Sequence, residues 1–411
     1  MHLDLQRKLA ILADAAKYDA SCASSGTEKR DSTKGGIGST EGSGICHSYA
    51  PDGRCISLLK VLLTNFCVYD CAYCINRSSS NVARARFSVE EVVALTLDFY
   101  RRNYIEGLFL SSGIIRSPDY TMEAMVRVAR TLRVAHEFKG YIHLKIIPNA
   151  SPELLAEAAV HADRLSTNIE LPTDMSLATL APEKAPSAIR TAMAHIEGKR
   201  EESRPDGKGA DGKPKPTVLA PAGQSTQMII GADATDDAGI LKRSATLYAG
   251  YGLKRVYYSA FSPIPDASRK LPLQPPPLMR EHRLYQADWL MRFYGFTANE
   301  IAVEDGFLDL KIDPKLAWAL KHRALFPLDI NRADRELLLR VPGLGVSSVD
   351  GIIAARRHHH LRLEDVARLC SSARKVRAFI VAEDWTPGAS LDDDRLRARM
   401  TPEPKQLSLF Q

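Results

Sequence analysis

Two kinds of apolar pattern alternate along residues 57–265 of the chain. Short, mostly apolar runs of strand length are found at residues 57–63, 107–111, 141–147, 164–171, 227–230 and 255–261. The segments between them have helical spacing: after Ser88 and Glu91, which form a capping box, Val92, Leu95 and Phe99 repeat on one helix face. Near-continuous apolar strands alternating with amphipathic helices predict an α/β fold, with a parallel sheet covered by helices on its outer face. Six such units predict a partial (β/α)6 barrel, in which the chemistry lies at the carboxyl ends of the strands.

Changes in composition divide the chain into five predicted segments. Residues 1–56 combine an amphipathic helix, at about residues 5–18, with a Gly/Ser/Thr-rich stretch at residues 21–43 that buries too little apolar surface to fold unaided. The remaining segments are the barrel (57–270), a helical connector (271–322), an all-α module (323–388) and a polar tail (389–411).

The composition narrows the class of protein only modestly. The chain has 411 residues, of which 45% are hydrophobic, and its formal net charge of +6 permits contact with a polyanion but is common among soluble enzymes. No stretch approaches the roughly 18 uninterrupted apolar residues of a membrane span, and the first residues lack the layout of a signal peptide. We therefore expect a cytoplasmic protein without a membrane partner. Disulfides seldom persist there, so the seven cysteines call for metal binding, catalysis or burial.

Three cysteines follow directly after the first predicted strand. Cys67, Cys71 and Cys74 have the spacing C-x3-C-x2-C, with Tyr73 just before the last of them. Three thiolates this close in sequence can each bind one iron of a cubane cluster and leave the fourth iron open to another ligand. A structural zinc ion usually takes four protein ligands, so a set of three fits zinc less well. The spacing therefore favours a [4Fe-4S] cluster.

With these residues the sequence resembles the radical S-adenosylmethionine (SAM) superfamily, over roughly residues 57–265. In that family the open iron binds the amino and carboxylate groups of the methionine part of SAM, which is cleaved to a 5′-deoxyadenosyl radical. The resemblance implies a radical-SAM-type barrel, with a [4Fe-4S] cluster and SAM as cofactors and a flavodoxin or ferredoxin as electron donor.

The same resemblance assigns cofactor-binding residues at two strand ends. Where the family has Gly-Gly-Glu at the end of the second strand, this chain has Ser111-Ser112-Gly113, so a carboxylate is missing from that place. After the fourth strand, Asn168 and Glu170 resemble the polar strand end that contacts the ribose and carboxylate of SAM. The predicted SAM-binding residues are Tyr73, Ser111, Ser112, Gly113, Asn168 and Glu170.

Three further cysteines lie near the Gly/Ser-rich stretch. Cys22, Cys46 and Cys55 are widely and irregularly spaced, and His47 adjoins the second of them. They could hold a second iron–sulfur cluster or a zinc ion, as auxiliary clusters are common in the superfamily. Alternatively they are ordinary buried thiols, or one of them donates a hydrogen atom to a substrate radical.

A glycine-rich turn joins two predicted helices near the C-terminus. Residues 341–346 form the turn, and Ser347 is expected to cap the second helix. Gly343 and Gly345 allow positive φ and leave backbone amides accessible at a helix start, where a phosphate oxygen binds well. This stretch resembles a helix-hairpin-helix module, which binds the DNA backbone without recognising bases. The predicted DNA contacts are Gly343, Gly345, Ser347 and Arg356, with Arg340 and Arg357 nearby; the alternative is a hairpin used only for packing.

The last residues form a short motif at the end of the polar tail. Gln406, Leu407, Leu409 and Phe410 suit an extended peptide that docks into an apolar groove. They resemble the pentapeptide by which bacterial polymerases and repair proteins bind the replication sliding clamp. The resemblance predicts the clamp as a partner, and the alternative is a frayed terminus.

Together these features favour a radical SAM enzyme that acts on DNA, in lesion repair or base modification. The layout resembles a bacterial family of DNA modification or repair radical proteins, in residues 15–22, 44–47 and 279–285 among others. Two alternatives remain: a radical SAM enzyme that modifies tRNA or another RNA, and a cluster-bearing DNA-binding adaptor without turnover. Asn168 and Glu170 favour an enzyme over the adaptor, and the clamp-like tail favours DNA over RNA.

Overall fold

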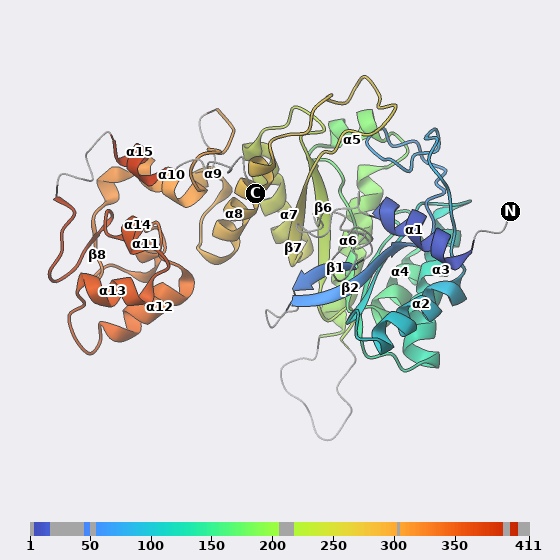
Figure 1. The fold of residues 1–411 in the computed structure, drawn as a ribbon, viewed down its shortest axis with the longest axis horizontal. Coiled ribbons are helices and arrows are strands. Elements are labelled where there is room, and N and C mark those ends of the chain that lie inside the picture. The colour runs from blue at the N-terminus through green and yellow to red at the C-terminus, as the bar shows by residue number, and fades with distance from the viewer. Residues whose placement is uncertain are drawn as a thin grey trace, which may run out of the picture. The chain divides into compact units, whose positions relative to one another are not determined.

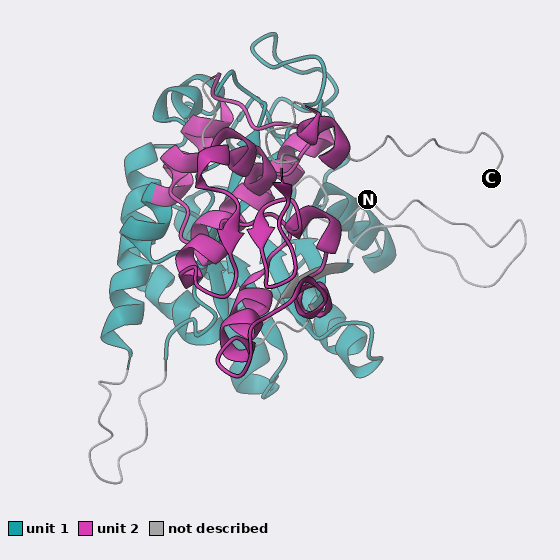
Figure 2. Ribbon diagram, turned by 90° about the vertical axis from the view of Figure 1, so that its left-hand side faces the viewer, with its two compact units in different colours: residues 1–235, 246–276 teal, residues 236–245, 277–411 magenta. Residues whose placement is uncertain are grey.

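The structure, a computed structural model, divides the chain into two compact units (Figures 1 and 2). Unit 1 comprises residues 1–235 and 246–276, and unit 2 comprises residues 236–245 and 277–411. The structure describes residues 4–16, 45–49, 55–204, 218–301, 305–388 and 395–401. Residues 1–56 fall within unit 1, whereas residues 277–322 of the predicted connector and the whole C-terminal module fall within unit 2.

Unit 1 is built on a seven-stranded sheet whose strands follow one another in chain order. The first pair is antiparallel, and the five pairs from β2 to β7 are all parallel. The six parallel strands form a curled half-barrel, which confirms the predicted α/β fold and partial barrel (Figure 1). The strands are β1 (Ile45–Tyr49), β2 (Cys55–Leu62), β3 (Gly107–Ser111), β4 (Tyr141–Lys145), β5 (Arg164–Ser166), β6 (Gln224–Ile230) and β7 (Arg255–Ala260).

Helices connect the parallel strands and cover the outer face of the sheet. α1 (Leu5–Ala16) precedes the sheet, and the connecting helices are α2 (Val89–Arg101), α3 (Pro118–Arg130), α4 (Pro152–His161), α5 (Asp174–Leu180), α6 (Pro186–Glu202) and α7 (Asp237–Tyr251), of which residues 237–245 belong to unit 2. The predicted capping box starts α2: the amide of Glu91 donates to Ser88 Oγ (3.1 Å) and the amide of Ser88 donates to Glu91 Oε2 (2.8 Å). Leu108 and Leu110 of β3 and Met122 and Met125 of α3 are fully buried in the common core.

The strand after α4 is shorter than the apolar run predicted. β5 ends at Ser166, and beyond it the chain stays bonded to β6 irregularly: the amide of Thr167 donates to the carbonyl of Ser225 (3.1 Å), and Glu170 forms an isolated parallel bridge with Met228. Glu170 has φ +65°, a left-handed conformation that is costly for a side chain with a Cβ. Residues 167–170 therefore form a strand-end loop, which frees polar side chains to project from the edge of the sheet.

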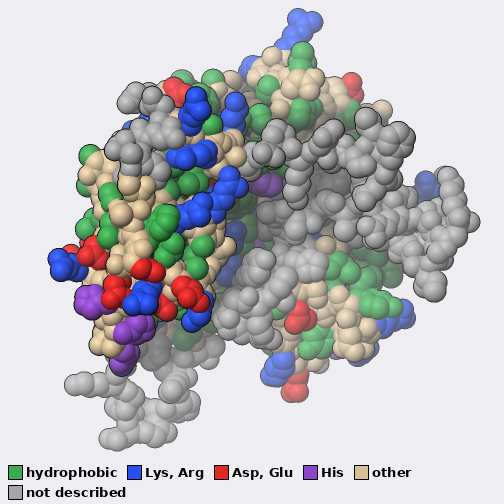
Figure 3. Space-filling model, turned by 60° about the vertical axis from the view of Figure 1, so that its left-hand side comes forward, with side chains coloured by type: hydrophobic (Ala, Val, Ile, Leu, Met, Phe, Trp, Pro, Cys, Tyr) green, Lys and Arg blue, Asp and Glu red, His purple; other side chains and the backbone are tan. Residues whose placement is uncertain are grey.

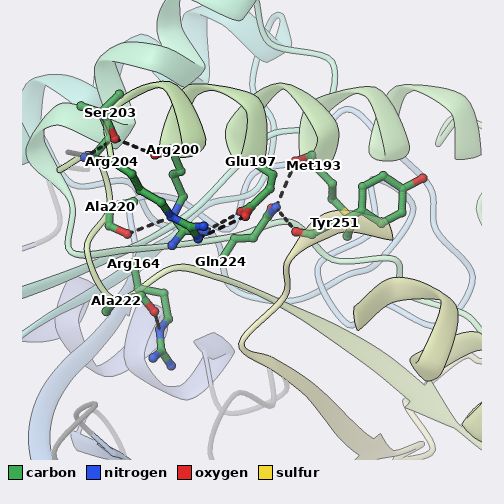
Figure 4. Close-up of polar contacts among 11 residues, drawn as sticks. Arg164, Met193, Glu197, Arg200, Ser203, Arg204, Ala220, Ala222, Gln224 and Tyr251 are labelled. Carbon is green, nitrogen blue, oxygen red and sulfur yellow. Dashed lines mark hydrogen bonds and ion pairs between the residues drawn. The ribbon is translucent and has the colours of Figure 1, made fainter. Parts of the chain in front are cut away.

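A buried polar network ties α6 to the loop before β6, at the end of the sheet where β6 begins (Figure 4). Arg200 is 4% exposed, pairs with Glu197 and donates through Nε to the carbonyl of Ala220 (3.2 Å). Gln224 Nε2 donates to the carbonyls of Met193 (3.0 Å) and Tyr251 (2.7 Å). These contacts hold α6 to the loop before β6 and to the first residue of β6.

Unit 2 is mainly helical, as predicted. Its first helix after residue 277, α8, is fixed by two arginines: Arg280 Nε donates to the buried Asp237 (2.7 Å), and Arg283 donates to the carbonyls of Asp309 and Leu310 (3.1 Å each). The helices are α8 (Leu278–Phe293), α9 (Ala298–Ile301), α10 (Pro314–Lys321), α11 (Arg335–Leu338), α12 (Val346–Ala355), α13 (Leu363–Leu369), α14 (Ala373–Val376) and α15 (Leu396–Met400).

The C-terminal module is not purely helical, which corrects one detail of the prediction. β8 (Leu328–Asp329) pairs in parallel with β9 (Ile380–Val381) and joins the beginning of the module to its end. Strands of two residues are too short to produce an alternating pattern, so apolar periodicity could not predict them. In the part of the chain that the structure describes, no helix is both long and apolar enough to cross a membrane.

Candidate functional site

The three clustered cysteines lie on a loop at the carboxyl end of β2, the edge at which a parallel barrel places its chemistry. Backbone hydrogen bonds fix this loop from two sides. The amide of Val68 donates to the carbonyl of Ile114 after β3 (2.8 Å), and the amide of Ala72 donates to the carbonyl of Leu180 at the end of α5 (2.7 Å). The loop is therefore held in place by the protein itself.

Two arginines shape the chain that follows the cysteines. Arg84 donates to four backbone carbonyls, those of Asn65, Asn76, Arg77 and Ser80. Arg77 donates to the carbonyl of Asp266 beyond β7 (2.6 Å). A planar guanidinium with five donors is suited to gather several carbonyls in this way. These arginines explain how a loop with little regular structure keeps one conformation.

A cavity of about 200 Å³ opens beside the cysteines. Residues from the cysteine loop, from the ends of β3 to β6 and from the segment after α5 line it, and Ala15 of α1 contributes as well. The structure brings nine predicted residues together here: Cys67, Cys71, Tyr73, Cys74, Ser111, Ser112, Gly113, Asn168 and Glu170. Their shared location is what a ligand site requires, and the role of each residue remains a prediction.

A buried ion pair crosses the cavity wall. Lys184 Nζ lies 2.5 Å from Glu170 Oε1 and 5.8 Å from the ring centroid of Tyr73. Burial opposes the charge on Lys184, but Glu170, Tyr73 and Cys71 together hold its pKa well above the usual value for lysine. Lys184 is thus a cation beside the cysteines. Sequence reasoning missed it because it lies between α5 and α6, in a segment without strand or helix periodicity.

A second polar chain runs along the ends of β4 to β6. Asn168 Nδ2 donates to Gln227 Oε1 (3.1 Å), and Lys145 Nζ lies 3.4 Å from the same oxygen. Asn168 Nδ2 also lies 3.4 Å from Glu170 Oε2. Lys145, the last residue of β4, and Gln227, in the middle of β6, were not predicted, although both line the cavity. The strand-end polar groups thus form one connected network.

Two buried hydroxyl groups lining the cavity have no hydrogen-bond partner among the described residues. They are the Tyr73 hydroxyl and Ser111 Oγ. A buried polar group without a partner costs free energy, so both hydroxyls indicate a site for a polar ligand. Gly113 is required by close packing: a Cβ there would lie 2.3 Å from the carbonyl oxygen of Phe66. Ser111, Ser112 and Gly113 thus bring the end of β3 against the cysteine loop.

Burial affects the thiols of Cys71 and Cys74. Burial raises the pKa of Cys71 to about 12, against the opposing charge of Lys184, and burial also raises the pKa of Cys74. Metal binding must therefore displace the thiol protons. Among the described residues, no three His, Cys, Asp or Glu side chains converge on a single metal ion. A cubane cluster does not need that arrangement, because each thiolate binds a different iron. Three cysteines beside a partly polar cavity fit such a cluster.

The predicted second metal site cannot be assembled from the described atoms. Cys22 lies outside the described residues, and of Cys46 and Cys55 the structure describes only the backbone, in β1 and β2. In the antiparallel register Cys46 is opposite Leu58 and Cys55 is opposite Tyr49. A second cluster or zinc at these cysteines remains a prediction.

The glycine-rich turn of unit 2 lies between α11 and α12, and its assignment to a helix-hairpin-helix module stays a prediction. Gly343 has φ +89°, and a Cβ there would lie 2.8 Å from Val376 Cγ2, so both conformation and space require glycine. The helix cap differs from the prediction: Gly345 is the N-cap of α12, and Ser347 is exposed within its first turn. Lys315 of α10 donates to the carbonyl of Leu344 (2.6 Å) and fixes the turn from within the unit.

Arg356, a predicted DNA contact, and Arg340, predicted to lie near it, both form contacts within unit 2. Arg356 Nη1 donates to the carbonyls of Ile330 (3.1 Å) and Ala333 (2.7 Å). Arg340 lies 3.7 Å from the ring centroid of Phe296 and pairs with Glu300 (2.9 Å). The sequence could not distinguish these internal contacts from surface charge. DNA contact by Arg356 therefore stays a prediction, and the geometry gives it a structural role.

Three consecutive histidines after α12 lie on the surface of unit 2, and the predicted clamp-binding residues lie outside the described residues. His358, His359 and His360 are exposed, and His359 Nε2 lies 3.6 Å from Asp365 Oδ2. The face drawn in Figure 3 shows grouped histidines beside acidic and basic side chains. The clamp-like residues Gln406, Leu407, Leu409 and Phe410 lie outside the described residues.

No protein-family model matches this chain, and no curated protein matches its sequence. Among solved structures it is similar to HydG, a maturase of the [FeFe]-hydrogenase, at 16% identity and a TM-score of 0.41, over 56% of this chain and 48% of that one. A HydG structure from Carboxydothermus hydrogenoformans gives 14% and 0.42, over 56% and 50%. The cobalamin-dependent S-adenosylmethionine radical enzyme OxsB gives 9% and 0.33, over 79% and 52%. The similarity spans about half the length of these proteins.

Proposed function

We propose that this protein is a radical SAM enzyme that acts on DNA, in lesion repair or base modification. The observation that carries the proposal is the cavity at the carboxyl edge of the half-barrel. It is lined by Cys67, Cys71 and Cys74 together with the polar ends of four neighbouring strands. A site of this kind, at the open edge of a parallel sheet, is where α/β proteins place their ligands.

The residues present have defined roles in the proposed site. Cys67, Cys71 and Cys74 would hold a [4Fe-4S] cluster, and the adjoining strand ends would hold SAM. When bound, the cluster and SAM supply one-electron chemistry that no side chain provides. Lys184 and Glu170 present opposite charges to the cavity, which suits the carboxylate and ammonium groups of an amino-acid ligand.

The other cavity residues position the ligand and keep water out. The hydroxyls of Tyr73 and Ser111 can donate hydrogen bonds to a polar ligand, because neither is occupied within the described protein. Ile146, Ile147 and Ile229 add apolar wall, and most of the exposed lining of the cavity is apolar. An apolar enclosure with few polar groups both orients a cofactor and limits side reactions with solvent.

The hairpin in unit 2 supports DNA as the substrate. α12 has ten residues, and the first amides of a helix have no partner within it. With Gly345 as the N-cap and Ser347 exposed, this end of the helix suits a backbone phosphate. The sliding clamp, bound through residues 406–410, and a flavodoxin or ferredoxin donor are further parts of the proposal.

Anaerobic reconstitution tests the enzymatic proposal. Protein loaded with iron and sulfide, reduced in the presence of SAM, is expected to release 5′-deoxyadenosine, detected by chromatography and mass spectrometry. The substitution Cys71→Ala should lower cluster iron and abolish this product together. Cys370→Ala is the matched control, because Cys370 lies in unit 2 at the end of α13 and does not line the cavity. Wild-type protein that binds no cluster, or releases no 5′-deoxyadenosine, would contradict the proposal.

A further inference from the structure

The strand register places five basic side chains on the inner face of the half-barrel. Residues paired in register on parallel strands point to the same face of the sheet. One row of the inner face, across β2 to β5, is Lys60, Phe109, His143 and Arg164. A second row, across β4 to β7, is Lys145, Ser166, Ser225 and Arg255. The alternate residues, among them Leu108 and Leu144, pack in the hydrophobic core of unit 1 instead.

No acidic residue accompanies these basic side chains on the parallel strands β2 to β7. The described carboxylates closest to the strand ends bond to other groups or are exposed: Glu106 accepts the amide of Ser57, Asp163 pairs with Arg133, Glu170 pairs with Lys184, Asp233 accepts from Thr235, and Glu137 is exposed. Among the described residues, the inner face of the strands therefore presents basic side chains and no acidic side chain of its own.

A second, smaller cavity lies against this inner face. His143, Lys145, Ser166, Ser225 and Tyr257 are among the residues that line it, and its volume of about 10 Å³ is that of roughly one water molecule. Lys145, Asn168 and Gln227 line both this cavity and the cysteine cavity, so they form the partition between the two. Lys145 Nζ lies 3.4 Å from Gln227 Oε1, which is long for a hydrogen bond. Rotation of these two side chains would join the cavities without moving the strands.

Three hydroxyl groups of the inner face are buried without a hydrogen-bond partner among the described residues. They are Ser111 Oγ, the Tyr141 hydroxyl and Ser225 Oγ. Ser225 is 0% exposed and lines the small cavity. Burial raises the pKa of Tyr141 to about 12, although the charge of Arg164 opposes the shift, so this hydroxyl keeps its proton and can donate it. Buried donors without acceptors indicate a ligand that supplies acceptor oxygens.

We propose that the inner face of the half-barrel binds a phosphate group of the substrate, with His143, Lys145 and Ser225 as the nearest ligands. The inference rests on the proposed function, because it assumes that the reacting part of the substrate lies in the cysteine cavity. The phosphate reaches the small cavity when the side chains of Lys145 and Gln227 turn aside.

The distribution of donors favours a phosphate over a carboxylate. The basic side chains and the unpartnered hydroxyls come from two rows of residues on different strands. The oxygens of a phosphate are arranged tetrahedrally and can accept from both rows, whereas the two oxygens of a carboxylate lie in one plane. Lys60, whose Nζ lies 5.6 Å from the ring centroid of Phe109, adds positive charge at the end of the first row.

Binding measurements test this site without turnover. Each of the four deoxynucleoside 5′-monophosphates is titrated into the full-length protein by calorimetry, beside the matching nucleoside, which lacks only the phosphate. At least one monophosphate is expected to bind about tenfold more tightly than its nucleoside. Lys145→Met and Lys60→Met should each remove most of that difference. Lys139→Met is the matched control, because Lys139 is exposed in the loop before β4, and it should bind as the wild type does.

Ser225→Ala separates binding from folding. The Ser225 hydroxyl has no partner among the described residues, so its removal should leave thermal unfolding unchanged and weaken the monophosphate about threefold. A dinucleotide, whose only phosphate joins two nucleosides, identifies the source of the group. If Lys145→Met weakens the dinucleotide, the site accepts a phosphate within a nucleic-acid chain. If it weakens only the monophosphate, the ligand is a free nucleotide.

The outcomes distinguish this inference from the proposed function. Monophosphates that bind no more tightly than nucleosides, or that bind Lys145→Met and Ser225→Ala as tightly as the wild type, would overturn the phosphate site. That result could stand beside normal release of 5′-deoxyadenosine, and the proposed function would survive it. Conversely, a wild type that binds phosphate with the expected pattern of variants but holds no cluster would contradict the proposed function and leave the phosphate site in place.

Discussion

The ion pair between Glu170 and Lys184 is the most constrained interaction of the cavity. Both side chains are largely buried, with 13% and 19% of their surfaces exposed, and Glu170 is held at φ +65° by backbone hydrogen bonds to Gln227 and Ile229. Breaking a buried pair from one side leaves a charge without compensation, which costs far more than the pair contributes when both partners are removed. The two residues should therefore behave as a unit.

Replacing Lys184 alone tests this coupling. Lys184→Met is expected to lower the unfolding free energy of unit 1 by about 3–5 kcal/mol, because the Glu170 carboxylate stays buried without a cation. The double substitution Lys184→Met/Glu170→Gln should recover most of that loss. Urea unfolding of the cluster-free protein, followed by far-ultraviolet circular dichroism, gives both values. Equal destabilisation of the single and double variants would show that the pair is not the source of the effect.

Sequence reasoning could place Glu170 at the site but not Lys184. Glu170 follows an apolar strand, and the carboxyl ends of parallel strands meet at one edge, so its location follows from the pattern. Lys184 reaches the cavity from a loop between two helices, and only the folded chain brings that loop beside the cysteines. For the same reason Arg340 and Arg356 looked like surface charge in the sequence, although the fold uses both internally.

Among the elements, α10 and the hairpin turn before α12 are linked by one buried lysine. Lys315 is 7% exposed, donates to the carbonyl of Leu344 and lies 4.7 Å from the ring centroid of Tyr294. Burial lowers the pKa of Lys315 to about 7, because Asp313 only partly offsets the loss of hydration and Arg340 opposes the charge. A neutral amine can still donate to the carbonyl, so the link survives deprotonation.

This lysine makes the stability of unit 2 depend on pH. Between pH 7 and about 10.5 the unfolded chain binds a proton at Lys315 that the folded chain does not, so the unfolding free energy should rise with pH. The slope of the unfolding free energy against pH is on the order of 1 kcal/mol per pH unit in this range. Below pH 7 both the folded and the unfolded chain bind the proton, so Lys315 adds no further dependence on pH. Other groups also titrate in this range, so the quantity to compare is the difference between the wild type and Lys315→Met, which lacks the titrating amine.

The chain allows unit 2 to be observed separately in this experiment. Its three tryptophans, Trp289, Trp318 and Trp385, all lie in unit 2, and Trp318 is buried in α10 close to Lys315 in sequence. Tryptophan fluorescence during urea unfolding at pH 6 to 10 therefore reports on this unit. A difference between wild type and Lys315→Met that does not change with pH would contradict a lowered lysine pKa.

At the scale of the whole molecule, the elements with a clear apolar pattern were predicted from the sequence, and the short elements without one were not. The barrel strands β2, β3, β4, β6 and β7 follow from apolar runs bounded by helical spacing, and the sheet order is the chain order. The sequence did not predict β1 (Ile45–Tyr49), which directly follows a Gly/Ser-rich stretch. It is the first strand of the sheet and forms its hydrogen bonds with β2. β8 and β9 were missed because two residues contain no period. Long-range pairing of short segments is set by the packed core and leaves little trace in local sequence.

The cysteine cavity belongs to unit 1, and the proposed DNA contact belongs to unit 2. The DNA contact can therefore be tested without disturbing the cavity. Ser347→Glu places an acidic group in the first turn of α12, where the helix dipole favours negative charge, so the helix should remain folded. The same charge repels a phosphate bound at that end.

We expect Ser347→Glu in the full-length protein to weaken binding to duplex DNA by about tenfold, the scale of one charged hydrogen bond lost. Ser347→Gln has the same size without the charge and should bind nearly as the wild type does. Fluorescence anisotropy with a labelled duplex, measured over a range of salt concentrations, gives both the affinity and its salt dependence. Because the cavity lies in unit 1, both variants should still incorporate a cluster like the wild type. Unchanged DNA binding by Ser347→Glu would mean that any DNA contact lies elsewhere in the chain, and that the hairpin serves only to pack unit 2.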